Sequence, residues 1–285
     1  MAEITLENVS FYHGKDTPYE IKALKNVNLT VPSGVITGII GHTGSGKSTM
    51  VQLFNGLHRP AEGKVLIDGV DIWENPKKIK DVRFRVGLVM QYPEYQLFEE
   101  TIYKDIAFGP KNMGVADDEI HERVIEAAKF VDLDPAILDK SPFDLSGGQK
   151  RRAAIAGIIA MRPEILVLDE PAAGLDPRGR DSIFKNIMDY QRESGATVII
   201  VSHSMEDMAK YCDNIVLMKG AHIIKTGTVS EIFACPDLLY EAGLTMPLVF
   251  EVAEKLRAAG VPLKGELYTV DGLKEALLRA LGERN

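Results

Sequence analysis

Residues 41–48 constrain the fold of this 285-residue chain more than any other segment. They read Gly-His-Thr-Gly-Ser-Gly-Lys-Ser and fill every fixed position of the phosphate-loop pattern G-x-x-x-x-G-K-[ST]. An apolar run at residues 35–40 predicts a strand before the loop, and a helix is expected to begin at Lys47. A glycine turn that merely joins a strand to a helix is the alternative, but this context favours a site for a nucleoside triphosphate.

The chemistry of such a loop lies in its backbone and in two side chains. Glycines let the backbone amides curl around phosphate oxygens, and the helix N-terminus favours an anion. Lys47 would place a charge near the outer phosphates, and Ser48 would offer its hydroxyl to Mg²⁺. The predicted ATP-binding residues of this segment are Gly41, His42, Thr43, Gly44, Ser45, Gly46, Lys47, Ser48 and Thr49.

Hydrophobic periodicity predicts an α/β fold built on a largely parallel sheet. Strands are expected at residues 4–9, 27–31, 35–40, 64–67, 85–90, 165–169, 197–202 and 215–218. Strand–helix alternation over residues 1–227 indicates a P-loop NTPase domain with a β-rich N-terminal part and a helical insertion at about 93–161. Residues 228–285 are expected to form a small C-terminal helical domain of two amphipathic helices, the second capped by Asp271.

Composition narrows the classes of function. A net charge of −8 argues against general affinity for nucleic acid or an anionic lipid surface. No apolar run approaches the roughly 18–20 residues that span a bilayer, and no signal segment opens the chain. Cys212 and Cys235 have no metal-ligand spacing and fit a reducing compartment, by default the cytosol. Any work at a membrane would therefore need a protein partner.

A second chemical signal is the pair Asp169-Glu170 at the end of the apolar run 165–169. The carboxyl ends of parallel strands are where α/β sheets bind ligands. Asp169 would face the phosphate loop and hold Mg²⁺, while Glu170 would lie further out as the base for an attacking water. Capping of the next helix is the alternative, but the phosphate loop upstream favours the functional interpretation.

The segment Leu145-Ser-Gly-Gly-Gln149 has the features of a second anion-binding helix start. Because the chain already has one phosphate cradle, this segment suggests completion of another subunit's site. At these residues the sequence resembles the ATP-binding cassette (ABC) family over residues 3–227. Gln91, Gly174-Leu-Asp176 and His203 follow the family's order and spacing.

The resemblance implies that two cassettes enclose two ATP molecules in a head-to-tail sandwich. Ser146, Gly148 and Gln149 would contact the γ-phosphate held by the partner, and Asp176 would cross the interface. Gln91 would approach Mg²⁺ and the attacking water, and His203 would bind the γ-phosphate and steady that water with Glu170. Either Tyr12 or His13 would stack on adenine; the sequence leaves both open.

Residues 91–98 and 106–110 resemble the Q-loop region of energy-coupling-factor (ECF) transporter ATPases, and residues 169–177 and 202–209 resemble their second type. This implies a paralogous ATPase partner, with a heterodimer favoured over a homodimer. It also implies a transmembrane coupling subunit, a membrane substrate-binding subunit, vitamin or transition-metal cargo, and a place on the cytoplasmic face of the cell membrane. The alternatives are another ABC importer subfamily, a soluble ABC ATPase of DNA repair or translation, and a regulatory module without turnover. The intact Lys47, Gln91, Asp169, Glu170 and His203 disfavour the last.

Overall fold

The computed structural model describes residues 2–265 and 267–282, and it contains two β-sheets. The larger has the strand order β10-β9-β3-β8-β7-β6, in which β10 alone is antiparallel to its neighbour. The smaller is antiparallel, with the order β2-β1-β4-β5. The strands are β1 (Ile4–His13), β2 (Ile21–Val31), β3 (Ile36–Ile40), β4 (Glu62–Ile67), β5 (Val70–Asp71), β6 (Val86–Val89), β7 (Ile165–Asp169), β8 (Thr197–Val201), β9 (Asn214–Lys219) and β10 (His222–Thr228).

The five parallel strands of the larger sheet are buried on both faces, as their continuous apolar runs predict, whereas β10 has no buried residue. Along β7, Ile165 and Val167 join one hydrophobic cluster, while Leu166 and Leu168 join the other. The first cluster lies against the small sheet and the helix α1 (Lys47–Phe54). Because successive side chains alternate between the two faces, each strand anchors both cores and fixes where its carboxyl end emerges.

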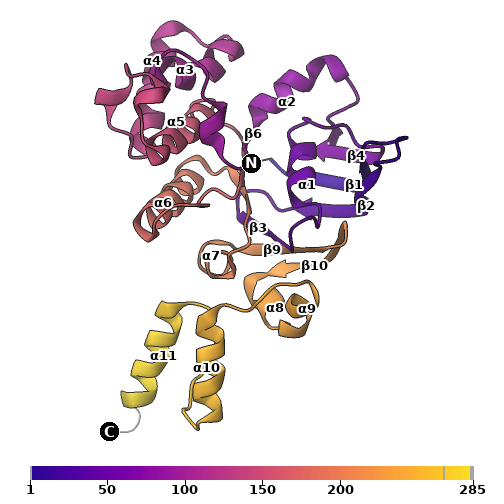
Figure 1. Cartoon of the computed structure of the whole chain (residues 1–285), viewed down its shortest axis with the longest axis vertical. Coiled ribbons are helices and arrows are strands. Elements are labelled where there is room, and N and C mark those ends of the chain that lie inside the picture. The colour runs from indigo at the N-terminus through magenta and orange to yellow at the C-terminus, as the bar shows by residue number, and fades with distance from the viewer. Residues whose placement is uncertain (1, 266, 283–285) are drawn as a thin grey trace.

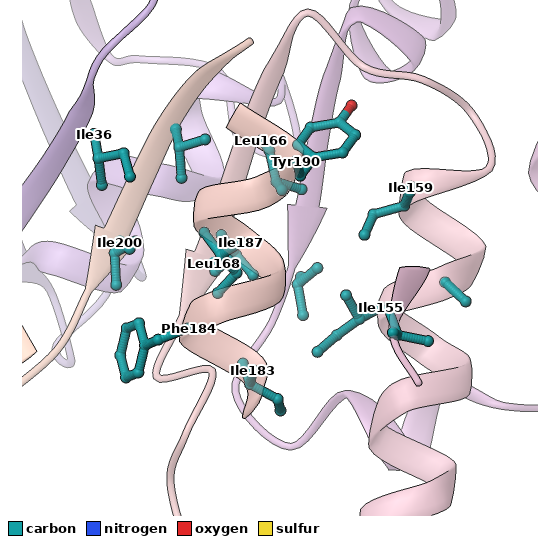
Figure 2. Packing of buried hydrophobic residues seen from close by; sticks show 14 of the residues in the cluster. Ile36, Ile155, Ile159, Leu166, Leu168, Ile183, Phe184, Ile187, Tyr190 and Ile200 are labelled. Carbon is teal, nitrogen blue, oxygen red and sulfur yellow. The ribbon is translucent and has the colours of Figure 1, made fainter. Parts of the chain in front are cut away.

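Helices cover the other face of the larger sheet. Figure 2 shows Phe184 and Ile187 on one helix, α6 (Pro177–Ser194), with Ile200 of the sheet to one side of this helix and Ile155 to the other. Ile155 and Ile159, on the helix that follows the signature residues, are buried in the same cluster. Tyr190 at the end of this row donates its hydroxyl to the Pro163 carbonyl at 3.0 Å.

A helical segment is inserted between β6 and β7 and lies apart from the small sheet (Figure 1). The remaining helices before β9 are α2 (Ile79–Arg85), α3 (Ile102–Met113), α4 (Asp117–Phe130), α5 (Gly147–Ile159), α6 (Pro177–Ser194) and α7 (Met205–Tyr211). Short 3-10 turns are η1 (Pro76–Lys78), η2 (Pro93–Gln96), η3 (Pro135–Ile137) and η4 (Pro142–Asp144). The parallel sheet with a helical insertion confirms the predicted fold class.

The C-terminal part packs in two pieces. Helices α8 (Val229–Phe233) and α9 (Pro236–Glu241) contribute to the main hydrophobic cluster, which extends to Met246. Helices α10 (Leu248–Ala258) and α11 (Val270–Gly282) share a small cluster of their own and project away from the body in Figure 1. The domain limits 1–227 and 228–285 remain predictions.

The predicted cap of the last helix was wrong. Asp271 lies inside the first turn of α11, and Thr269 accepts the amide hydrogen of Gly272 at 3.1 Å through its hydroxyl. Threonine and aspartate are both good capping residues, so the sequence allowed either start. Within residues 2–265 and 267–282, no helix is long and apolar enough to cross a bilayer.

Candidate nucleotide site

Four parallel strands end at one edge of the larger sheet, and each is followed by predicted site residues. The order β3-β8-β7-β6 places the phosphate loop, His203, Asp169-Glu170 and Gln91 side by side. They line one cleft of about 820 Å³. Its lining residues include His13, Lys22, Gly41, His42, Thr43, Gly44, Gly46, Lys47, Ser48, Thr49, Gln91, Asp169, Glu170 and His203.

Two glycines hold the phosphate loop in its curled form. Gly44 and Gly46 have φ angles of +80° and +104°, which residues with a side chain rarely adopt. A Cβ atom on Gly46 would also lie 2.4 Å from the Ala23 carbonyl oxygen. Lys47 begins α1 and folds back over the loop, donating to the carbonyls of Gly41 at 2.7 Å and His42 at 3.0 Å. The loop is therefore pre-formed around a cation.

The floor of the cleft carries opposite charges at close quarters. Burial lowers the pKa of Lys47, and the charges of Glu170 and Asp169 oppose this. Burial raises the pKa of Asp169, a change strengthened by Glu170 and opposed by the Ser48 hydroxyl and by Lys47. A buried carboxylate beside a hydroxyl and a lysine is suited to a site that gains further charge when phosphates and a cation enter.

Glu170 is held by β8 and by the two residues that follow this strand. Its φ angle is +52°, an uncommon left-handed conformation for glutamate, and its amide donates to the Val201 carbonyl at 2.9 Å. Its Oε1 lies 2.8 Å from Nδ1 of His203, and Ser202 Oγ donates to Oε2 at 3.4 Å. The carboxylate is 12% exposed and the imidazole 75% exposed. Glu170 thus sits at the inner end of a hydrogen-bonded pair that opens to the cleft.

The two candidates for adenine stacking have different surroundings. His13 lines the cleft, and its Nε2 lies 3.0 Å from the Thr49 hydroxyl behind the phosphate loop. Tyr12 is absent from the described lining, and Lys22 Nζ lies 4.8 Å from its ring centroid. The alternation of side chains along β1 therefore points His13 to the cleft and Tyr12 away from it.

The signature residues form a separate hollow of about 460 Å³. Ser146, Gly148, Gln149 and Asp176 all line it, and none of its lining residues lines the phosphate-loop cleft. Ser146 and Gln149 form a capping box at the start of α5. Asp176 caps α6 by accepting from the Gly179 amide at 2.7 Å. Two helix starts thus face one hollow, which the chain's own phosphate loop does not complete.

Comparisons with known proteins agree with this arrangement. The sequence profile of the family described as ABC transporter matches residues 24–173. The energy-coupling factor transporter ATP-binding protein EcfA2 of Caldanaerobacter subterraneus subsp. tengcongensis is 50% identical over 99% of this chain and 99% of its own length. The protein of the same name from Clostridium acetobutylicum is 50% identical over 98% of each. The chain belongs to the ABC transporter family, among the ATP-binding proteins of ECF transporters.

Solved structures extend the comparison to three dimensions. CbiO1 of Clostridium perfringens, part of the ABC transporter complex CbiONQ, matches 88% of this cassette and 98% of its own chain, with 38% identity and a TM-score of 0.74. A dimeric post-hydrolysis state of the cassette MJ0796 bound to ADP and Pi matches 79% of this chain and 98% of its own, with 29% identity and a TM-score of 0.72. As an ECF transporter ATPase, this ABC protein binds ATP and couples its hydrolysis to transport.

One part of the lining of the cleft was not predicted from the sequence. Gly243, Leu244 and Thr245 line it from the C-terminal side, and a Cβ on Gly243 would lie 3.6 Å from the Cβ of His42. Leu244 and Met246 are buried in the main cluster, whereas Thr245 is exposed at the cleft. No local pattern in residues 243–245 signals this, because the contact arises from tertiary packing alone.

Proposed function

We propose that this chain is the hydrolytic subunit of an ECF transporter in which each ATP is enclosed between two cassettes. The observation that carries the proposal is the division of the family's site residues between two hollows that share no lining residue. The cleft supplies a phosphate loop, two carboxylates and a histidine. The signature hollow supplies helix starts suited to an anion that another chain holds.

Within the cleft, the proposed roles follow from position. Lys47 and the amides of the loop bind the phosphates, and His13 packs against adenine. Glu170 accepts a proton from the attacking water, and His203, hydrogen-bonded to Glu170 at 2.8 Å, fixes the direction of that carboxylate and binds the γ-phosphate. Gln91 orients the water from the β6 side. Positioning and charge neutralisation then supply most of the acceleration.

The donor set also fits Mg²⁺. Asp169 and the Ser48 hydroxyl are hard oxygen donors in hydrogen-bond contact, and Gln91 offers an amide oxygen in the same cleft. Mg²⁺ commonly binds through one or two carboxylates together with the phosphates of a substrate. When bound, Mg²⁺ would neutralise phosphate charge; Asp169, Ser48 and Gln91 would hold it.

An exposed aromatic surface supports membrane partners. Tyr92, Tyr95, Phe98 and Phe108 are 47%, 85%, 65% and 44% exposed, and all belong to the Q-loop region or the helix that follows it. Clustered exposed aromatics are typical of binding surfaces. We infer that a transmembrane coupling subunit docks here and that a small membrane substrate-binding subunit completes the transporter. The cassette would then lie on the cytoplasmic face of the membrane and power uptake of vitamins or transition-metal ions.

The partner cassette is proposed to be a paralogue, with a homodimer as the alternative. Mild detergent purification of the tagged chain from its native membrane tests both partner proposals. A sister ATPase and small integral-membrane subunits should co-purify. Recovery of an exclusively soluble assembly would contradict them.

Two substitutions test the division of the site. Glu170→Gln should preserve MgATP binding and slow hydrolysis by roughly 10²–10⁴-fold, the usual contribution of a positioned acid or base. Ser146→Arg should leave binding intact but prevent ATP-dependent association, because the bulky cation fills the signature hollow. Near-normal turnover of the first variant, or unimpaired association of the second by light scattering, would refute the corresponding role.

A further inference from the structure

Arg151 is one of the few charged side chains buried in this protein, with 4% of its surface exposed. It lies on α5, the helix that begins at the signature residues. Its Nε donates to Glu94 Oε2 at 3.2 Å and its Nη2 to Glu94 Oε1 at 3.1 Å, which makes a forked, two-bond ion pair. Its Nη1 donates to the backbone carbonyl of Ala173. One guanidinium plane therefore fixes three separate segments.

Each of these segments carries a residue of the proposed nucleotide machinery. Glu94 lies in η2, three residues after Gln91. Ala173 lies three residues before Asp176, and its amide donates to the Glu170 carbonyl at 3.1 Å. Arg151 itself follows Ser146 by five residues. The ion pair and the carbonyl contact thus connect the residues facing this chain's own ATP to those facing the partner's ATP.

The path between Gln91 and Glu94 is short and conformationally restricted. Tyr92 has a φ angle of +56°, and Pro93, which begins η2, has a φ angle fixed by its ring. This restricted backbone would pass a movement of Gln91 on to Glu94. The rigid planar fork of arginine transmits displacement of either partner, which the single flexible ammonium of lysine does not reproduce.

We propose that Arg151 is a positioning residue that couples the nucleotide-facing end of the Q-loop segment to the signature helix and to the segment that carries Asp176. Entry of ATP at the phosphate loop shifts Gln91, and Arg151 carries this shift to α5. The signature residues then reach the orientation that the second cassette requires. This inference rests on the proposed function, because it assigns a task to Gln91, Ser146 and Asp176.

The main alternative is that the buried pair only stabilises the fold. Removing one partner leaves a buried uncompensated charge, so a single substitution could fail by unfolding. The double variant Arg151→Met, Glu94→Gln avoids this, since it removes both charges and keeps the volume. Its matched control is Arg162→Met, Glu126→Gln, which removes an arginine–glutamate pair whose side chains are 52% and 64% exposed. Arg151→Lys retains the charge but lacks the fork.

Hydrogen exchange of the full chain in the Glu170→Gln background, diluted until it is monomeric, provides the test. MgATP should slow exchange at residues 41–48 in every variant. It should also alter exchange at residues 146–150 in the parent and in the control pair, and this second change should disappear in the Arg151→Met, Glu94→Gln variant. With Glu170 restored, this variant and Arg151→Lys should lose roughly 10- to 100-fold in kcat with unchanged MgATP affinity, which is the expected cost of a misplaced group.

The opposite results would overturn the inference. One such result is an MgATP-dependent change in exchange at residues 146–150 that persists in the double variant. The others are the absence of this change in the parent and a kcat of the double variant equal to that of the control pair. A parallel loss of MgATP affinity and melting temperature would identify a purely structural pair and equally overturn it. Failure of the two-cassette proposal would appear differently, as absent ATP-dependent association of the parent chain, and the monomer exchange result would stand.

Discussion

The phosphate loop offers a quantitative test in two neighbouring glycines. Gly44 and Gly46 both have positive φ angles, but a Cβ on Gly44 would meet no atom within 4 Å, whereas one on Gly46 would lie 2.4 Å from the Ala23 carbonyl oxygen and 3.0 Å from Leu24 Cδ2. Gly44→Ala therefore introduces only backbone strain, about 1–2 kcal/mol for an L-residue in this region. If the loop of the variant relaxes in the absence of nucleotide, binding must restore the strained conformation, and the affinity for MgATP falls by about 5- to 30-fold.

Gly46→Ala adds a collision with the backbone of β2, which a side-chain rotation cannot relieve. The loop must shift, and its amides and the start of α1 leave their positions around the phosphates. Loss of one hydrogen bond to a charged group costs about 1.5–3 kcal/mol, so we expect an affinity at least about tenfold below that of Gly44→Ala. Calorimetric titration with MgATP in the Glu170→Gln background measures both, with melting temperature as a folding control. Equal losses, or a larger loss for Gly44→Ala, would refute this view of the loop.

Three further predictions concern residues outside this pair. Lys47→Ala should weaken MgATP binding by about 10- to 100-fold by calorimetry, since a charged hydrogen bond contributes about 1.5–3 kcal/mol; unchanged binding would contradict the cradle. Thr245→Val should raise the KM for ATP about fivefold if its hydroxyl donates one hydrogen bond to the nucleotide, and leave the melting temperature unchanged. A hydrogen bond from Arg85 holds the pKa of Glu164 below its ordinary value of 4.5. Burial would raise the pKa of Asp68, but hydrogen bonds from the Glu3 amide and from Arg85 hold it below its ordinary value of 3.8. The ion pairs of Arg85 with Glu164 and Asp68 therefore stabilise the fold at pH values above these ordinary pKa values, and the stabilisation is lost as the pH falls and the carboxylates are protonated. Arg85→Met should lower the free energy of unfolding in urea by about 0.2–1 kcal/mol per pair near neutral pH and should leave it unchanged near pH 2.

The sequence was most informative where chemistry and periodicity coincide. The apolar runs before Gly41, Gln91, Asp169 and His203 predict strands, and parallel strands that end at one sheet edge bring those residues together. The six-stranded sheet has this order, so the cleft could be anticipated without coordinates. Only the structure shows that His13 rather than Tyr12 lines the cleft, because this depends on which residue of β1 faces inward after the register shifts along the strand; the adenine contact itself stays a prediction.

What sequence could not provide is contact between segments that lack a local signal. Thr245 is exposed at the cleft beside Gly243 and Leu244, a position that follows from the packing of Leu244 and Met246 into the main cluster. Arg151 looks like one of several basic residues on a surface helix until its ion pair with Glu94 is seen. The cap of α11 depended on a choice between Thr269 and Asp271 that local propensity does not resolve.

The division of the site has a consequence for a transporter with two unlike ATPases. Each enclosed ATP would contact the phosphate loop of one chain and the signature helix of the other. A substitution of Ser146 would then impair the pocket formed by the partner's phosphate loop, whereas a substitution of Lys47 would impair the pocket formed by this chain's own loop. Arg151 connects the two pockets, because it lies on the helix that begins at Ser146 and contacts the segments that carry Gln91 and Asp176. The buried ion pair between Arg151 and Glu94 would thus make ATP at one pocket a condition for completing the other, and two chains could act as one cooperative unit without any contact between the nucleotides.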